Sequence, residues 1–64
     1  MIDFDQMEVG DAERMPHPTI WGAANREEYN RAQDCTTRTG KLFSVETEFN
    51  AGGQITGFII TRTK

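Results

Sequence analysis

The chain is poor in cysteine and histidine, and this scarcity excludes several kinds of site. Its 64 residues include one cysteine, Cys35, and one histidine, His17. A lone cysteine forms no disulfide within the chain, and one cysteine with one histidine is too small a set for a four-ligand zinc site. The sequence therefore predicts no disulfide, no metal and no cofactor. An unpaired cysteine is also more typical of the reducing cytoplasm than of a secreted protein.

Long hydrophobic runs are absent as well. The longest uninterrupted apolar stretch is the three residues Phe58, Ile59 and Ile60, whereas a membrane-spanning helix needs about 20. The N-terminus is acidic, and a signal peptide begins with basic residues. We therefore expect a soluble, cytoplasmic protein that does not bind a membrane.

The short length limits the hydrophobic core. A chain of 64 residues forms one domain and buries only about 60% of the surface that its unfolded form exposes. Because no disulfide adds stability, homodimerisation is the available way to bury more surface.

Acidic residues are in excess, and they are concentrated in the first half of the chain. Residues 1–34 hold eight acids and three arginines, a net charge of −5, while residues 35–64 hold four bases and two acids, a net charge of +2. Two interpretations stay open. Either the two halves attract each other within the fold, or the acidic half presents its electrostatic field to a basic partner.

The last third of the sequence predicts a β-hairpin. Two stretches with strand composition, 42–49 and 55–63, flank the turn residues 50–53, which include two glycines. Alternate side chains of a strand point to opposite faces. The first strand then places Phe43, Val45 and Phe49 on an apolar face, and Ser44, Glu46 and Glu48 on a solvent-exposed face.

Two registers compete for this hairpin. We favour the one that places Val45 opposite Phe58 and Phe43 opposite Ile60, because it pairs aromatic with β-branched side chains. A tight two-glycine turn would instead place Phe43 opposite Arg62.

The second strand of the hairpin is apolar on both faces. Ile55 and Ile59 lie on the face opposite Phe58 and Ile60, because neighbouring side chains alternate. Such a strand is either the central strand of a covered sheet or one whose outer face meets a partner. Both interpretations stay open.

The first 24 residues predict a short strand followed by a long loop. Ile2 and Phe4 alternate with acids, which indicates a strand at about residues 2–7. Prolines and glycines between residues 10 and 22 then indicate a loop. Trp21, near the end of this loop, either anchors it to the core or contacts a partner.

A helix is predicted over residues 25–38. Asn25 stands three residues before Glu28, which is the spacing of a capping box, and Gly40 lies where a helix would stop. A start about one turn earlier is the alternative. The apolar stripe of this helix is thin, and consists of Tyr29, Ala32 and either Cys35 or Thr36.

The order of elements is β-α-β-β. It predicts an α+β fold in which one α-helix packs on a two- or three-stranded antiparallel sheet with a C-terminal β-hairpin. Residues 1–64 form a single small domain, made of a partly loop-like N-terminal segment (1–24), the helix (25–38) and the hairpin (41–64).

No residue pattern predicts an enzyme. Nucleophilic catalysis needs an activated group beside a base, and nothing in the spacing joins Cys35 to His17. Glu46 and Glu48 lie about 7 Å apart on one strand face, a separation seen between paired carboxylates of hydrolases. A solvated strand face gives the same pattern, and a domain this small has little room for a site that excludes water.

Nucleic-acid binding is a further alternative. Four bases could converge at one end of the hairpin and contact phosphates. These are Arg38, Lys41, Arg62 and Lys64. The isoelectric point near 4.9 means that the rest of the protein would repel the nucleic-acid backbone, so direct binding of nucleic acid is not our main prediction.

The main prediction is a non-enzymatic protein-binding module. Small acidic proteins without a catalytic set are frequent among phage and mobile-element products that inhibit host enzymes or defence complexes. By this analogy of size and charge, we expect an inhibitor that binds a basic surface of a host protein or nucleoprotein complex in the host cytoplasm. A homodimeric cellular regulatory or accessory subunit is the alternative. The candidate protein-binding residues are Asp3, Asp5, Glu8, Asp11, Glu13, Trp21, Ile55 and Ile59.

Overall fold

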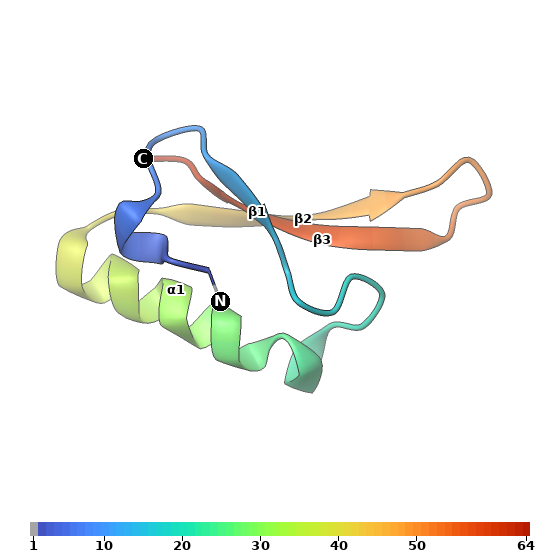
Figure 1. The fold of residues 1–64 in the computed structure, drawn as a ribbon, viewed down its shortest axis with the longest axis horizontal. Helices are drawn as coiled ribbons and strands as arrows, with labels where there is room; N and C mark the ends of the chain where they lie inside the picture. The colour runs from blue at the N-terminus through green and yellow to red at the C-terminus, as the bar shows by residue number, and fades with distance from the viewer. Residues whose placement is uncertain (1) are drawn as a thin grey trace.

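One α-helix lies along one face of a three-stranded antiparallel sheet (Figure 1). The computed structural model describes residues 2–64. Its strands are β1 (Ala12–Arg14), β2 (Phe43–Phe49) and β3 (Ile55–Arg62), and its helices are η1 (Phe4–Gln6), η2 (Gly22–Ala24) and α1 (Arg26–Thr39), of which η1 and η2 are short 3-10 helices. The strand order β1-β3-β2 makes β3 the central strand. The predicted α+β class and the order β-α-β-β are confirmed.

The predicted strand at residues 2–7 is wrong. This segment holds the 3-10 turn η1, and its apolar side chains Ile2, Phe4 and Met7 are buried. The Phe4 ring packs edge-on against Phe43 of β2 at 5.3 Å between ring centroids. Alternation of two apolar residues with acids also fits a buried irregular segment, so the pattern alone did not separate the two structures.

The first strand is instead Ala12–Arg14, which pairs with β3. Ala12 lies opposite Thr61 and Arg14 opposite Ile59. All three residues of β1 are exposed and none has high strand propensity. Pairing with β3 therefore determines this strand, and composition gave no sign of it.

A tight turn, Glu8 to Asp11, leads into β1. The Asp11 backbone N–H donates to the Glu8 carbonyl, and the Glu8 N–H donates to Asp11 Oδ2, each at 2.9 Å. Gly10 has φ +93°, a left-handed conformation that other residues rarely adopt. The Gly10 N–H then donates to the Arg62 carbonyl, and the Arg62 N–H donates to the Asp11 carbonyl. The turn is thereby fixed to the end of β3.

The hairpin adopts the register that we did not favour. Val45 lies opposite Ile60, Thr47 opposite Phe58 and Phe43 opposite Arg62. Phe58 and Ile60 nevertheless face the helix side and are buried, as the alternation of side chains predicted.

The turn explains this register. Gly53, with φ +78°, donates its N–H to the Asn50 carbonyl, which closes a turn of three residues. The Asn50 side-chain oxygen accepts from the amides of Gly52 and Gln54. A bulge follows between Glu48 and Phe49, and it shifts the pairing by one residue. Turn and bulge together give the register that a two-glycine turn would give.

Helix α1 begins where predicted, but without the predicted capping box. Asn25 occupies the N-cap position and its side chain makes no cap hydrogen bond. Glu28 instead pairs with Arg31, at 2.7 Å between Oε2 and Nη1. At the other end Gly40 has φ +81° and donates its N–H to the Thr36 carbonyl, so the predicted stop is confirmed.

The core lies between the sheet and α1, and the N-terminal segment completes it. From the thin stripe of α1, Ala32 and Cys35 are buried, whereas 39% of Tyr29 is exposed. The buried apolar residues are Ile2, Phe4, Met7, Met15, Ala32, Cys35, Phe58 and Ile60, with Phe43 and Val45 packed against them. Residues 2–7 therefore supply bulk that the helix lacks.

Candidate functional site

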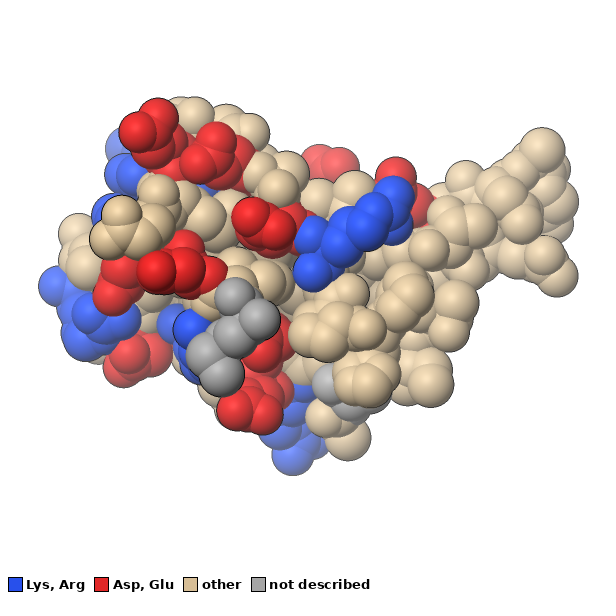
Figure 2. Space-filling model, viewed as in Figure 1, with Lys and Arg blue, Asp and Glu red and all other residues tan. Residues whose placement is uncertain are grey.

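The predicted binding residues do not form one surface. Four of the acids, Asp3, Glu8, Asp11 and Glu13, lie on the N-terminal segment, the following turn and β1; we refer to these four as the acidic face. Asp5, Trp21, Ile55 and Ile59 lie elsewhere. Figure 2 shows acidic side chains over the left and centre of this view, whereas the projecting right-hand end carries no charge.

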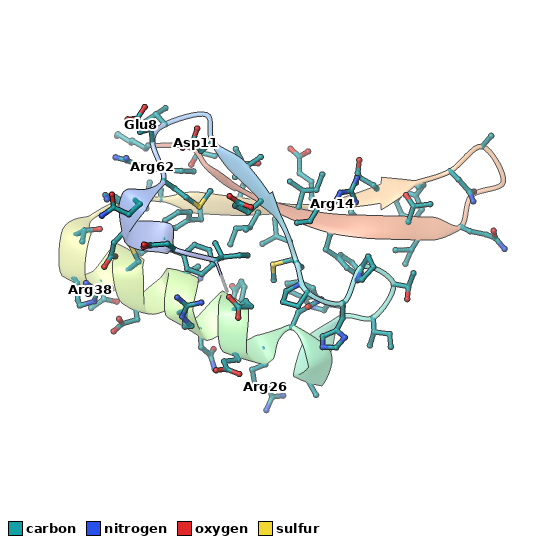
Figure 3. All side chains as sticks on the ribbon, in the orientation of Figure 1. Glu8, Asp11, Arg14, Arg26, Arg38 and Arg62 are labelled. Carbon is teal, nitrogen blue, oxygen red and sulfur yellow. The ribbon has the colours of Figure 1, made fainter. Side chains whose placement is uncertain are left out.

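An open groove of about 510 Å³ lies beside the acidic face. The N-terminal segment provides one wall, with Asp3, and the chain after the turn provides the other, with Asp11 and Glu13. The turn at Gly10 reverses the chain and so brings residues ten positions apart to one groove. Figure 3 shows Glu8 and Asp11 projecting from this turn beside the end of β3.

Arg14 also lines the groove, but its charge is engaged on the outer face of the sheet. Its Nη2 lies 2.9 Å from Glu48 Oε1, across the central strand β3. Glu48 Oε1 is shielded from solvent, and this ion pair is its polar contact. Within residues 2–64, no ion pair involves a carboxylate of the acidic face.

Asp5 is separated from the acidic face and bound to the end of α1. Its Oδ1 lies 3.1 Å from Arg38 Nη2, and its backbone carbonyl accepts a hydrogen bond from Lys41 Nζ. Contacts with the Cys35 thiol and then with the Arg38 guanidinium hold the pKa of Asp5 below its ordinary value. Asp5 therefore contributes to the packing of the N-terminal segment on α1.

The Arg38 guanidinium is shared between two carboxylates. Its Nε lies 2.7 Å from Asp34 Oδ2, one turn back along α1. The hydrogen bonds that Arg38 donates to Asp34, and then to Asp5, raise the pKa of Arg38 above its ordinary value. The side chain is exposed, so this pair of contacts adds orientation more than stability.

Arg62, another of the predicted cations, contacts the chain's own backbone. Arg62 Nη1 donates to the Met7 carbonyl at 2.8 Å, and its Nε donates to the Lys64 carbonyl at 3.2 Å. Arg62 thus ties the N-terminal segment to β3, a role that the sequence did not reveal. Three of the four bases considered for nucleic acid, Arg38, Lys41 and Arg62, serve such internal contacts.

Trp21 lies partly in the core and partly at the surface. Its ring is 5.3 Å from the Phe58 ring and 5.9 Å from the Tyr29 ring, between centroids, and 44% of the residue is exposed. It therefore anchors the loop before α1 and leaves apolar surface accessible.

The two isoleucines lie on different surfaces. The bulge brings Ile55 opposite Phe49 near the projecting end of the hairpin, where both are exposed. Ile59 is half-buried on the outer face, paired with Arg14 on one side and Glu46 on the other.

The projecting end has a feature that was not predicted from the sequence. Residues 15–25 and 49–61 contain no acidic or basic residue apart from His17. These stretches carry exposed Ile20 and Phe49 in addition to Trp21 and Ile55. Two long gaps in the charge pattern were the signal that could have indicated this apolar surface.

Cys35 and His17, the two residues considered for nucleophilic catalysis, lie in different environments. Cys35 is fully buried, with Sγ 3.6 Å from Thr39 Oγ1, and His17 is exposed in the loop. Residues 2–64 hold no cluster of three or more histidine, cysteine or acidic residues placed to bind a metal ion. In the same part of the chain, no helix has the length and apolar character needed to cross a membrane.

The fold and these surfaces define a small α+β domain with one helix on a three-stranded sheet. Comparison with known proteins finds no matching family model, no similar curated protein and no similar solved structure.

Proposed function

We propose that this chain is a non-enzymatic module that binds a basic surface of a partner protein through its acidic face. The observation that supports the proposal is the set of four exposed carboxylates that form no ion pair within residues 2–64. Carboxylates of one sign on one surface attract a basic partner over a distance and raise its association rate.

Some charged residues outside the acidic face form ion pairs between the two halves of the chain. Asp5 pairs with Arg38, and Arg14 pairs with Glu48. The first pair joins an acid of the acidic half to a base of the basic half, as one of the two interpretations of the charge pattern expects, whereas the second joins the halves with the opposite polarity. The acidic face lies outside these contacts, so its charge is available to a partner.

A narrower form of the proposal is an inhibitor of a host protein or nucleoprotein complex, of the kind that phages and mobile elements encode. It rests on the small size and acidic charge of the chain. The second candidate is a homodimeric accessory subunit, which is favoured by the exposed apolar side chains of Phe49 and Ile55 at the uncharged end.

Capture from lysate with matched variants tests the proposal. The test variant is Glu8→Gln with Glu13→Gln, and the control is Glu27→Gln with Asp34→Asn, which removes the same charge from α1. At about 50 mM salt we expect wild type and control to retain the same protein in stoichiometric amount and the test variant to retain less. Raising the salt to about 500 mM should release it, because the Debye length falls from about 14 Å to about 4 Å.

Other outcomes separate the alternatives. Capture that is indifferent to Glu8→Gln with Glu13→Gln and to salt would contradict binding through the acidic face. Recovery of the chain's own dimer alone would favour the accessory subunit, and recovery of DNA or RNA would favour nucleic-acid binding.

A further inference from the structure

Strand β2 leaves one backbone edge of the sheet unpaired. The Leu42 N–H donates to the Lys64 carbonyl, and the Thr63 N–H donates to the Leu42 carbonyl. Because bonding direction alternates along an antiparallel strand, Leu42, Ser44 and Glu46 bond toward β3. The N–H and C=O groups of Phe43, Val45 and Thr47 then point away from β3, toward the open edge.

Nothing in the described chain covers this edge. The opposite side of β3 is paired by β1 and by Met15, whose N–H donates to the Phe58 carbonyl at 2.9 Å. Beside β2 no element of residues 2–64 pairs in this way. The seven residues of β2 also include no proline or lysine, two residues that commonly protect an edge strand.

The two faces of β2 specify what could pair there. On the helix side Phe43 and Val45 are half-buried, so an apolar side chain from a neighbouring strand would complete their cover. On the outer face Glu46 is exposed and has no ion pair within the described residues. Glu48 is turned toward Arg14, away from the edge. A basic side chain beside Glu46 would be favourable.

A second copy of this chain fits the edge less well. Twofold pairing of β2 with itself about Glu46 places Glu46 opposite Glu46, and pairing about Thr47 places Glu46 opposite Glu48. Like charges directly opposite each other destabilise a strand pair. Pairing about Val45 avoids this, but it still joins two chains of net charge −3.

We propose that the open edge of β2 binds an extended segment of a partner protein in which lysine or arginine alternates with apolar residues. The segment adds a fourth strand through the backbone of Phe43, Val45 and Thr47. Its apolar side chains pack on Phe43 and Val45, and its cations meet Glu46. This inference rests on the proposed function, since it assigns a binding mode to the same basic partner, but it uses a surface separate from the acidic face.

A synthetic peptide tests the edge directly. The probe is an eight-residue peptide that alternates valine and lysine, acetylated and amidated at its ends, added to the full ¹⁵N-labelled chain. We expect chemical shift changes in β2, and slower solvent exchange of the Phe43, Val45 and Thr47 amides. A control peptide with the same side chains, N-methylated at alternate positions, keeps the charge but cannot donate the main-chain hydrogen bonds, and should not slow this exchange.

Two variants of the chain complete the test. Thr47→Pro removes an edge donor without removing a bond to β3 and should weaken peptide binding at least about 10-fold. Glu46→Lys reverses the charge at an exposed position and should weaken binding similarly, so the test does not depend on the folding of the proline variant. Glu8→Gln with Glu13→Gln should leave the slowed exchange at the edge in place.

Three results would overturn the edge site. Shift changes confined to residues 3–13 would show that the peptide binds the acidic face, which would leave the proposed function standing. Slow exchange at the β2 edge that grows with protein concentration, without peptide, would show that a second copy occupies it. An absence of shift changes at millimolar peptide would exclude this binding mode.

Discussion

At the scale of single residues, Asn25 holds the loop between β1 and α1. It is buried, with 1% of the residue exposed. Its side-chain oxygen accepts from the His17 N–H, and its Nδ2 donates to the His17 and Ile20 carbonyls at 3.0 and 2.6 Å. The capping spacing identified the residue, but its side chain serves the loop that precedes the helix.

Asn25→Ala should lower the free energy of unfolding by about 2–3 kcal/mol, because it leaves buried loop amides and carbonyls without partners. Urea denaturation followed by circular dichroism measures this loss. The matched control is Asn30→Ala, which truncates an exposed asparagine on the same helix and should change stability little. Equal stability of the two variants would show that the loop does not depend on Asn25.

The lowered pKa of Asp5 predicts a specific loss of stability in acid. Since the folded state holds this carboxyl below its ordinary pKa of 3.8, its contribution is full above that value and disappears as the pH falls through the folded pKa. The variant Asp5→Asn has no carboxylate at this position and therefore lacks this contribution to stability. The difference in melting temperature between wild type and Asp5→Asn should therefore be largest at about pH 6 and close toward about pH 2. A constant difference over this range would contradict the role assigned to the charge.

At the scale of elements, features that depend on one short stretch of sequence were predicted correctly, whereas the hairpin register, which depends on two features together, was not. Gly40 stops α1 where expected, and residues 50–53 turn the chain where expected. The register depends on two features at once, a three-residue turn and a bulge in the pairing of Glu48 and Phe49. Neither has a signal strong enough to outweigh the favourable cross-strand pairs that the other register offered.

The positive φ of Gly53 in the hairpin turn predicts that a side chain at this position lowers stability. Gly53→Ala should cost about 1–2 kcal/mol, because φ +78° places a Cβ close to the following carbonyl oxygen. A chemically synthesised chain with D-alanine at position 53 is the matched control, since a D-residue favours positive φ. It should restore the stability in a thermal melt, and an equal loss in both chains would point to a cause other than backbone conformation.

At the scale of the whole molecule, the N-terminal segment is part of the core. The sequence predicted a strand at residues 2–7, whereas Ile2, Phe4 and Met7 of this segment are buried in the core outside any strand. The thin stripe of α1 was the available indication that another segment must fill the core. The contacts that fix it there, Arg38 with Asp5 and Arg62 with the Met7 carbonyl, join residues far apart in sequence. No local pattern encodes such pairs.

Deletion of residues 1–7 should therefore unfold the domain. Each large apolar side chain removed from the core contributes about 1.5–3 kcal/mol, and small domains have total stabilities of about 5–15 kcal/mol. The loss of dispersed amide resonances in an NMR spectrum measures the outcome. Val9→Ala, which truncates an exposed residue of the adjoining turn, is the control and should fold. A folded deletion variant would show that α1 and the hairpin suffice.

Because Gly57 has no side chain, the ion pair between Arg14 of β1 and Glu48 of β2 can pass over the central strand. A Cβ at this position would lie 2.5 Å from Arg14 Nη1 and 2.9 Å from Glu48 Oε1. Any larger residue would therefore push this ion pair apart and free the Glu48 carboxylate. The charge displayed beside β2 would then rise from one carboxylate to two. A change in the middle strand, which makes no contact with the open edge, would thus tune how strongly that edge selects a cationic segment.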